Sequence, residues 1–212
     1  GPAALKDDAM RRDCTFNAIY YCLESRAVLD PTERGLQDLR NGIVRTPLPP
    51  REILRDDPLR LLRVVRFAST LGFRMDDELR QVMGEADVLQ DLATKVTRER
   101  VWIEFEKMLL LPTDGFERAM EDLQSVPHLL DIVLFPGVKW RATPLSAAVE
   151  SAVMDRTWVI PVRVAAMMLE HAKVLPQTLS QWKAQYQRRL VWSNETMSRT
   201  SQILNACLTL EK

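Results

Sequence analysis

Glycine is scarce in this sequence of 212 residues, with only seven, whereas leucine, arginine, glutamate, methionine and alanine are plentiful. Because glycine weakens helices and the abundant residues favour them, the composition favours a helical protein. No run of about 18 apolar residues is present, so we expect no membrane span. The formal net charge is zero. This excludes a general attraction to nucleic acid, and any RNA affinity must come from local arginine clusters.

Cysteine is also rare, and its three residues are Cys14, Cys22 and Cys207. The number is odd and no C-x-x-C spacing occurs, so we expect reduced thiols in a reducing intracellular compartment. No signal peptide is visible at the start. Since the chain begins with Gly1 and not with Met, that observation says little about targeting.

Apolar residues recur at helical spacing along most of the chain. The clearest helix is expected at 57–72, with Asp56 as its N-cap, Pro58 in its first turn and Gly72 at its end. Other helices are expected at 12–24, 76–83, 97–110, 114–123, 126–134, 143–155, 161–174, 177–190 and 194–210.

Strand signals are few. Ile43 and Val44 form a short strand candidate, and the prolines at 47, 49 and 50 predict a stiff extended linker after it. Asp30-Pro31 and Arg34-Gly35 are expected to mark a loop, and Gly35 and Gly42 are expected to supply backbone freedom at the two ends of a charged turn. Pro161 is expected to separate two helices. The predicted architecture is therefore a small strand region followed by a helical body.

The first chemical constellation lies near the start of the chain. Arg11 and Arg12 offer two guanidiniums for phosphate oxygens, and Asp13 and Asn17 are four residues apart, on one side of a predicted helix. Such a set suits a ribose and its phosphates. The simpler interpretation is a helix cap with solvated arginines.

A second constellation combines Asp57 and Arg60, three residues apart on the predicted helix. The simpler interpretation is an intrahelical ion pair. The alternative is a protein template for a base, because an aspartate accepts from an exocyclic amine and an arginine donates to ring acceptors, which suits cytosine and adenine. Arg63 and Arg66 continue the basic face, for which a solvated helix surface remains an equal alternative.

These segments resemble a known family. The sequence RRDCTFNA from Arg11 to Ala18 resembles the nucleotide-binding RRDxTxNA motif of tRNA nucleotidyltransferases, the family of CCA-adding enzymes and bacterial poly(A) polymerases. The segment with Asp57-x-x-Arg60 resembles the family's base-templating motif. The resemblance implies that Arg11, Arg12, Asp13, Asn17, Asp57, Arg60 and Arg63 bind the nucleotide.

Two further segments resemble motifs of the same family. Asp30, Gly35 and Asp38 resemble its flexible hinge element, and the continuation to Pro49 is similar to eukaryotic members. The segment from Thr97 to Leu109 resembles its last conserved motif, which is mainly structural. We therefore expect Glu99 and Arg100 to be buried or half-buried residues of a structural network, without a chemical role.

The resemblance implies a mainly α fold, in which helical neck, body and tail regions follow the C-terminal remnant of a nucleotidyltransferase α/β domain. The expected segments are 1–50 for the catalytic-domain remnant, 51–140 for the neck with the templating helix, and 141–212 for the body and partial tail. The last segment is expected to contain tRNA-binding helices.

The implied activity is addition of C and A to tRNA 3′ ends from CTP and ATP with Mg²⁺. In this family the metal ligands come from an Asp-x-Asp pair upstream of the RRD motif, so we predict no catalytic residue and no metal ligand within this chain. Two alternatives remain open: a non-catalytic RNA-binding or scaffold subunit of a larger complex, and a poly(A) polymerase. RNA is the expected partner, and cytoplasm, nucleus and mitochondrion all remain possible locations.

Overall fold

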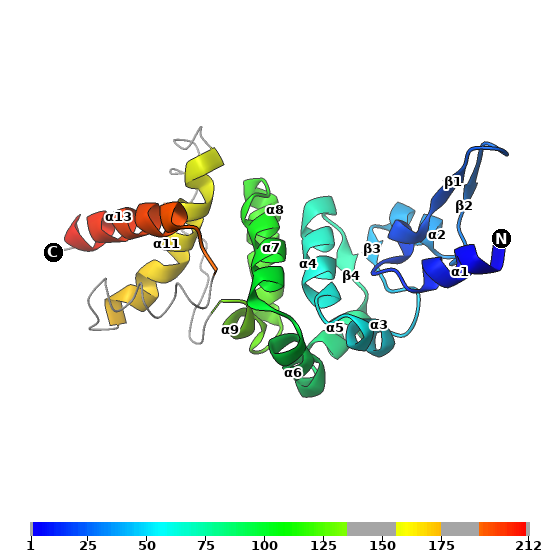
Figure 1. Cartoon of the computed structure of the whole chain (residues 1–212), viewed down its shortest axis with the longest axis horizontal. Coiled ribbons are helices and arrows are strands. Elements are labelled where there is room, and N and C mark those ends of the chain that lie inside the picture. Colours follow the sequence, from blue (N-terminus) through cyan, green and yellow to red (C-terminus); the bar gives the residue numbers. More distant parts are fainter. Residues whose placement is uncertain (1, 135–155, 175–190, 211–212) are drawn as a thin grey trace. The chain divides into compact units, whose positions relative to one another are not determined.

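The computed structural model describes residues 2–134, 156–174 and 191–210, and within these ranges most residues are helical (Figure 1). The predicted mainly α fold is confirmed. By its internal contacts the chain divides into two compact units, Gly1–Val96 and Thr97–Lys212. This division falls between α6 and α7 and differs from the expected segment limits near 50 and 140, which remain predictions.

The first unit begins with helix α1 and a 3₁₀ turn, η1, and then alternates short strands with short helices. Its two strand pairs are an antiparallel hairpin, β1–β2, with Tyr20 opposite Leu29, and a parallel pair, β3–β4, with Val44 opposite Met75. The elements are α1 (Pro2–Met10), η1 (Thr15–Ala18), β1 (Tyr20–Cys22), β2 (Ala27–Leu29), α2 (Gly35–Asn41), β3 (Ile43–Val44), α3 (Pro50–Asp56), α4 (Arg60–Leu71), β4 (Arg74–Met75), α5 (Asp77–Met83) and α6 (Ala86–Lys95).

The core of this unit forms around α4. Leu61, Leu62 and Val65 are fully buried on its inner face. They belong to a set of buried side chains that also includes Val44, Leu54, Leu79, Met83 and Leu92. Gly72 ends α4 in the left-handed conformation expected for a C-terminal glycine, with φ of 66°. The apolar stripe that includes Leu61, Leu62 and Val65 thus fixes the position of α4 in the core of this unit.

The second unit is helical throughout its described part. Its elements are α7 (Arg98–Leu109), α8 (Thr113–Ser125), α9 (Leu129–Val133), α11 (Arg156–Val174) and α13 (Asn194–Leu210). Phe105, Met108, Phe116 and Met120 are fully buried and form the core between α7 and α8. The helices expected at 97–110, 114–123 and 194–210 are confirmed, whereas the helices expected at 143–155 and 177–190 lie outside the described residues.

The helix expected at 12–24 is wrong. The chain bends after Met10, forms η1, and then enters β1, where Tyr20 and Tyr21 pair with the second strand of the hairpin. Aromatic residues fit a paired strand well, so the pairing partner at 27–29 overrides the local helical pattern. The charged turn expected between Gly35 and Gly42 is also wrong, since α2 occupies Gly35–Asn41.

Prolines explain two other differences. Pro50 does not extend the linker but begins α3, where its missing N–H has no helical partner to lose. Pro161 lies inside α11, although it was expected to separate helices. It cannot donate to the carbonyl of Thr157, and that carbonyl instead accepts from Arg199 Nη1 at 2.9 Å.

Two smaller differences concern the residues at which helices begin. α4 begins at Arg60 and not at 57, because Asp57 is extended with φ of −140°. α9 begins after His128, whose φ of 63° is incompatible with a continuing helix. α6 was not predicted.

None of the described helices has both the length and the apolar character needed to cross a membrane.

Candidate functional site

Asp13 is the centre of a polar cluster in the first unit. Its carboxylate is 5% exposed, and its Oδ2 accepts from Arg63 Nε at 2.8 Å and lies 2.6 Å from Arg63 Nη2. Its Oδ1 accepts from Asn17 Nδ2 at 2.9 Å. The structure therefore brings together three of the residues expected at a nucleotide site, although η1 and not an α-helix carries Asn17.

Aromatic side chains pack beside this cluster. Phe16 of η1 meets Phe67 of α4 and Phe73 edge to face, with ring centroids 6.1 and 5.8 Å apart. The guanidiniums of Arg63 and Arg66 lie 5.7 and 4.2 Å from the centre of the Phe67 ring. Cation–π and edge-to-face contacts of this kind hold η1 against α4, so the RRD segment and the Asp57–Arg66 segment form one structural assembly.

Thr15 anchors the same segment from its other side. Its N–H donates to the carbonyl of Arg45 at 2.8 Å, and its hydroxyl donates to Asp38 Oδ2 at 2.8 Å. A Cβ on Gly35 would lie 2.5 Å from the carbonyl oxygen of Thr15. Gly35 is thus needed for close approach, which corrects the expected role as a source of backbone freedom. That role holds at Gly42, whose φ is 62°.

Asp30 closes the turn that leads into α2. Its Oδ2 accepts from the N–H of Leu36 at 2.9 Å and its Oδ1 from the hydroxyl of Thr32 at 2.7 Å. Burial raises the pKa of Asp30, but these hydrogen bonds outweigh it and leave the pKa below its ordinary value. Asp30, Gly35 and Asp38 therefore form a tightly bonded turn in this structure, and a hinge motion there remains a prediction.

Asp57 and Arg60 lie at the junction between α3 and α4. Asp57 precedes α4, so the prediction that both residues share one helical face is wrong. The Oδ1 of Asp57 accepts from the N–H of Leu59 at 3.2 Å. Arg60 Nη1 donates to Asp56 Oδ2 at 2.7 Å and to the carbonyl of Ile53 at 3.0 Å. Both residues are partly exposed, and their backbones are joined by a bond from the N–H of Arg60 to the carbonyl of Asp57.

The two arginines of the RRD segment have exposed side chains. Arg12 forms an ion pair with Asp8 at 2.7 Å and lies over the ring of Tyr20 at 5.9 Å. The hydroxyl of Tyr20 also donates to Asp8, and this bond, followed by the Arg12 bond, lowers the pKa of Asp8. Arg11 and Arg12 thus lie outside the cluster around Asp13. Their side chains face solvent, where a phosphate group could reach them.

Cys14 lies next to these residues and is fully buried. Burial raises the pKa of its thiol well above the ordinary value, so a thiolate is strongly disfavoured there. The expectation of free thiols is confirmed for Cys14, Cys22 and Cys207.

Glu99 and Arg100 differ from the expectation, because both side chains are exposed. They occupy the outward face of the first turn of α7, whereas Trp102 and Phe105 occupy its inward face. The buried charge of this helix is Glu104, which is 3% exposed and pairs with Lys107 at 2.8 Å. Glu99 and Arg100 are therefore not the buried or half-buried residues that were expected.

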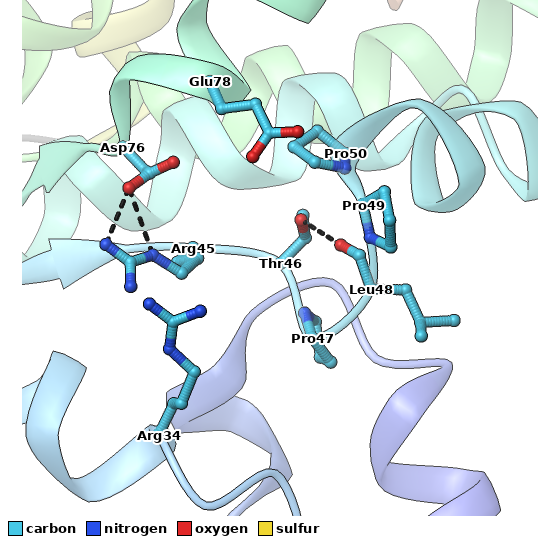
Figure 2. Close-up of a pocket in the computed structure, with 9 residues that line it drawn as sticks. All are labelled: Arg34, Arg45, Thr46, Pro47, Leu48, Pro49, Pro50, Asp76 and Glu78. Carbon is cyan, nitrogen blue, oxygen red and sulfur yellow. Dashed lines mark hydrogen bonds and ion pairs between the residues drawn. The ribbon is translucent and has the colours of Figure 1, made fainter.

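A pocket of about 350 Å³ lies between the extended segment 46–49 and the start of α5 (Figure 2). Its charged lining consists of Arg34, Arg45, Asp76 and Glu78. Arg45 donates to Asp76 Oδ1 from Nε at 3.1 Å and from Nη2 at 2.7 Å. Two positive and two negative groups cancel, so this pocket has no net attraction for a polyanion such as RNA.

Arg45 was not among the predicted site residues. Asp76, its main partner, lies 31 residues later in the chain, so no local spacing identifies the pair. Within the part of the chain that the structure describes, no three His, Cys, Asp or Glu side chains are grouped so that they could hold a metal ion.

Comparison with known proteins places these features in a family. A model of the poly(A) polymerase head domain matches residues 2–45. The mitochondrial CCA tRNA nucleotidyltransferase of Saccharomyces cerevisiae is 43% identical over 130 residues, which cover 61% of this chain. The CCA-adding enzyme of Pediococcus pentosaceus is 34% identical over 184 residues, which cover 85% of this chain. The chain belongs to the tRNA nucleotidyltransferase and poly(A) polymerase family.

The structural comparison agrees with this assignment. The CCA-adding enzyme of Bacillus stearothermophilus, solved in complex with CTP, is 26% identical and matches with a TM-score of 0.71 over 98% of this chain. The Thermotoga maritima CCA-adding enzyme, solved with tRNA, is 18% identical with a TM-score of 0.69, so it shows the shared fold alone.

The chain spans only part of these family members. It covers 23% of the yeast relative, 43% of the Pediococcus relative and 48% of the Bacillus stearothermophilus structure. The family assignment therefore does not by itself give the activity, substrates and partners of the complete protein.

Proposed function

We propose that the complete protein adds C and A to the 3′ ends of tRNA, using CTP and ATP. The observation that carries this proposal is the pairing of the RRD segment with α4 in one assembly, through the contact of Asp13 with Asn17 and Arg63. Relatives named for CCA addition match 61% and 85% of this chain. A solved relative above 25% identity carries CTP.

Within this assembly, Asp57 and Arg60 would read the incoming base. Cytosine and adenine each present an exocyclic amine as donor and a ring nitrogen as acceptor, which a carboxylate and a guanidinium complement. Both residues lie at one partly exposed helix junction, and a carboxylate and a guanidinium can each form several hydrogen bonds at once. Uracil and guanine present a carbonyl where the amine would be, so the same pair would disfavour them.

Arg11, Arg12, Asp13 and Asn17 would hold the sugar and phosphates. The exposed guanidiniums of Arg11 and Arg12 suit phosphate oxygens. Asp13 and Asn17 would contribute mainly by fixing the shape of the segment, since the Asp13 carboxylate is bonded at both oxygens. Arg63 would act on the nucleotide through Asp13.

Asp30, Gly35 and Asp38 would form the hinge. Mg²⁺, required by nucleotidyl transfer, would have its ligands outside the described residues.

tRNA is the proposed RNA partner, and no observation on the described residues identifies a larger complex. The yeast and Candida glabrata relatives are mitochondrial by name. We accordingly propose a reducing intracellular location, with mitochondrion, cytoplasm and nucleus as the compartments to compare.

The test uses the complete protein and a tRNA transcript that ends before CCA. With CTP alone we expect addition of C residues that then stops, and with CTP and ATP together we expect a finished CCA end. Long A tracts made from ATP alone would instead support a poly(A) polymerase. Binding of the tRNA without nucleotide addition, with Mg²⁺ present, would support a non-catalytic RNA-binding or scaffold subunit.

A further inference from the structure

Arg45 lies between two carboxylates that belong to different helical segments. Its guanidinium donates twice to Asp76 Oδ1, just before α5, and its Nη1 lies 3.6 Å from Asp38 Oδ1 in α2 (Figure 2 shows the bonds to Asp76). The Arg45 side chain is 20% exposed and the Asp38 side chain 4%. One half-buried guanidinium thus links the end of β3 to α2 and to α5.

The same arginine reaches the RRD segment by two routes. The carbonyl of Arg45 accepts the N–H of Thr15 at 2.8 Å. The Asp38 carboxylate, which faces the Arg45 guanidinium through Oδ1, accepts the hydroxyl of Thr15 through Oδ2 at 2.8 Å. Thr15 begins η1, and it lies between Asp13 and Asn17 in the sequence. Movement at Arg45 would therefore be transmitted to both of them.

We propose that Arg45 is a positioning residue for nucleotide addition, acting through Asp38 and Thr15 on the segment Arg11–Asn17; this inference rests on the proposed function. Without Arg45, the Asp38 carboxylate would be buried with the Thr15 hydroxyl but without its nearby positive charge. An uncompensated buried charge is strongly unfavourable, so Asp38 would turn away or draw in water. Either movement would release the hydroxyl of Thr15.

This role predicts a particular kinetic pattern. Arg45 acts on the segment proposed to hold sugar and phosphates, and it has no contact with Asp57 or Arg60 among the interactions described. Its loss should impair CTP and ATP by the same factor and leave the preference for CTP over UTP unchanged. A residue that reads the base would change that preference.

The experiment compares three variants of the complete protein: Arg45→Met, the double variant Arg45→Met/Asp38→Asn, and Arg34→Met. Arg34 lines the same pocket as Arg45 and carries the same charge, so it is the matched control (Figure 2). We expect Arg45→Met to lower kcat/KM for both nucleotides at least about tenfold, the effect of losing one well-placed charged hydrogen bond. Arg34→Met should leave it unchanged.

The double variant tests the physical cause. Its Asp38→Asn substitution removes the negative charge but keeps a side-chain oxygen that accepts from the hydroxyl of Thr15. The double variant should therefore recover most of the activity lost in Arg45→Met. No recovery would overturn the proposal, because the defect would then not arise from the unpaired Asp38. An equal loss in Arg34→Met would also overturn it, since the pocket itself would then bind a ligand.

Hydrogen exchange separates this proposal from the proposed function, because it requires no activity. In Arg45→Met the backbone amide of Thr15 should exchange about tenfold faster than in the unmodified protein, and the double variant should restore protection. Unchanged exchange would overturn the positioning role even in an active enzyme. If Arg45→Met does not fold, Arg45→Lys, which keeps the charge but loses the forked geometry, is compared in its place and should give smaller changes in the same direction.

Discussion

Two nitrogens of Arg63 contact one carboxylate oxygen of Asp13, a residue 50 positions earlier in the sequence. Nε lies 2.8 Å and Nη2 lies 2.6 Å from Asp13 Oδ2. The carboxylate is 5% exposed and the arginine side chain 36%. This contact joins the turn that carries the RRD motif to the helix that follows Asp57. Its loss should affect both the fold of the first unit and the placement of the nucleotide.

Arg63→Gln should lower the free energy of unfolding by about 1–3 kcal/mol, because it leaves a nearly buried carboxylate without its charged partner. Denaturant unfolding measures the change. Arg74→Gln is the control: Arg74 is 64% exposed and lies 3.9 Å from an exposed Asp77, so its removal should change stability by less than about 0.5 kcal/mol. Equal effects of the two substitutions would show that the Asp13 contact has no special weight.

The proposed base template predicts a change in nucleotide choice. Asp57→Ala in the complete enzyme removes the acceptor for the exocyclic amine, so discrimination against UTP and GTP should fall by about 1–3 kcal/mol relative to CTP and ATP. Misincorporation assays with single nucleotides measure it. Glu52→Ala, at an exposed position of α3, should change nothing. A uniform loss of activity with every nucleotide in Asp57→Ala would mean that Asp57 is structural.

The proposed phosphate contact predicts the opposite pattern. Arg11→Ala should raise KM for all four nucleotides by about the same factor, because phosphate contacts carry no information about the base. Steady-state kinetics with each nucleotide would show this. Arg40→Ala removes the same charge from an exposed position of α2 and serves as the control. Selective loss of one nucleotide in Arg11→Ala would contradict the assignment.

The sequence predicted those parts of the fold that depend on local periodicity. α7 and α13 match the expected ranges within about one residue, since apolar spacing along one helix decides them. β1 and α2 were missed, because each depends on a distant partner. β1 needs the strand around Val28, and α2 begins where Gly35 packs against the carbonyl of Thr15.

The candidate site divides in the same way. The spacing placed Asp13 and Asn17 on one side of a helix that does not form, yet η1 brings the two side chains together at 2.9 Å. The contacts of Asp13 with Arg63 and of Arg45 with Asp76 join residues far apart in sequence, so only the fold reveals them. The placement of Asp57 outside the helix was missed, because its extended backbone differs from what a helical pattern predicts.

The close approach at Gly35 gives a stability prediction with an internal control. Gly35→Ala places a Cβ 2.5 Å from a backbone oxygen, so the backbone must shift, and we expect a loss of about 1–3 kcal/mol in the free energy of unfolding. Gly84→Ala meets its nearest atom at 3.5 Å and has an ordinary φ of −85°. It should be neutral or stabilise by up to about 1 kcal/mol, through the unfolded chain. Thermal or denaturant unfolding ranks the two, and equal values would contradict the crowding argument.

Arg163 gives the corresponding prediction for the second unit. It is 5% exposed, donates from Nη1 to the carbonyls of Leu109 and Leu111 at 2.6 and 2.7 Å, and lies 4.3 Å from the ring centre of Phe116. The two carbonyls lie at the end of α7, where the helix supplies no N–H donors for them. Arg163→Met keeps much of the apolar stem but removes the donors.

The resulting loss should be about 2–4 kcal/mol in the free energy of unfolding, because one buried and one partly buried carbonyl lose this donor and one cation–π contact is removed. Arg163→Lys should recover part of it, since an ammonium reaches a carbonyl but lacks the planar guanidinium that stacks on Phe116. Arg118→Met, at an exposed position of α8, is the control and should change stability by less than about 0.5 kcal/mol. If Arg163→Met and Arg118→Met unfold at the same denaturant concentration, Arg163 does not hold the end of α7, and the packing of α11 on α7 must rest on apolar contacts alone.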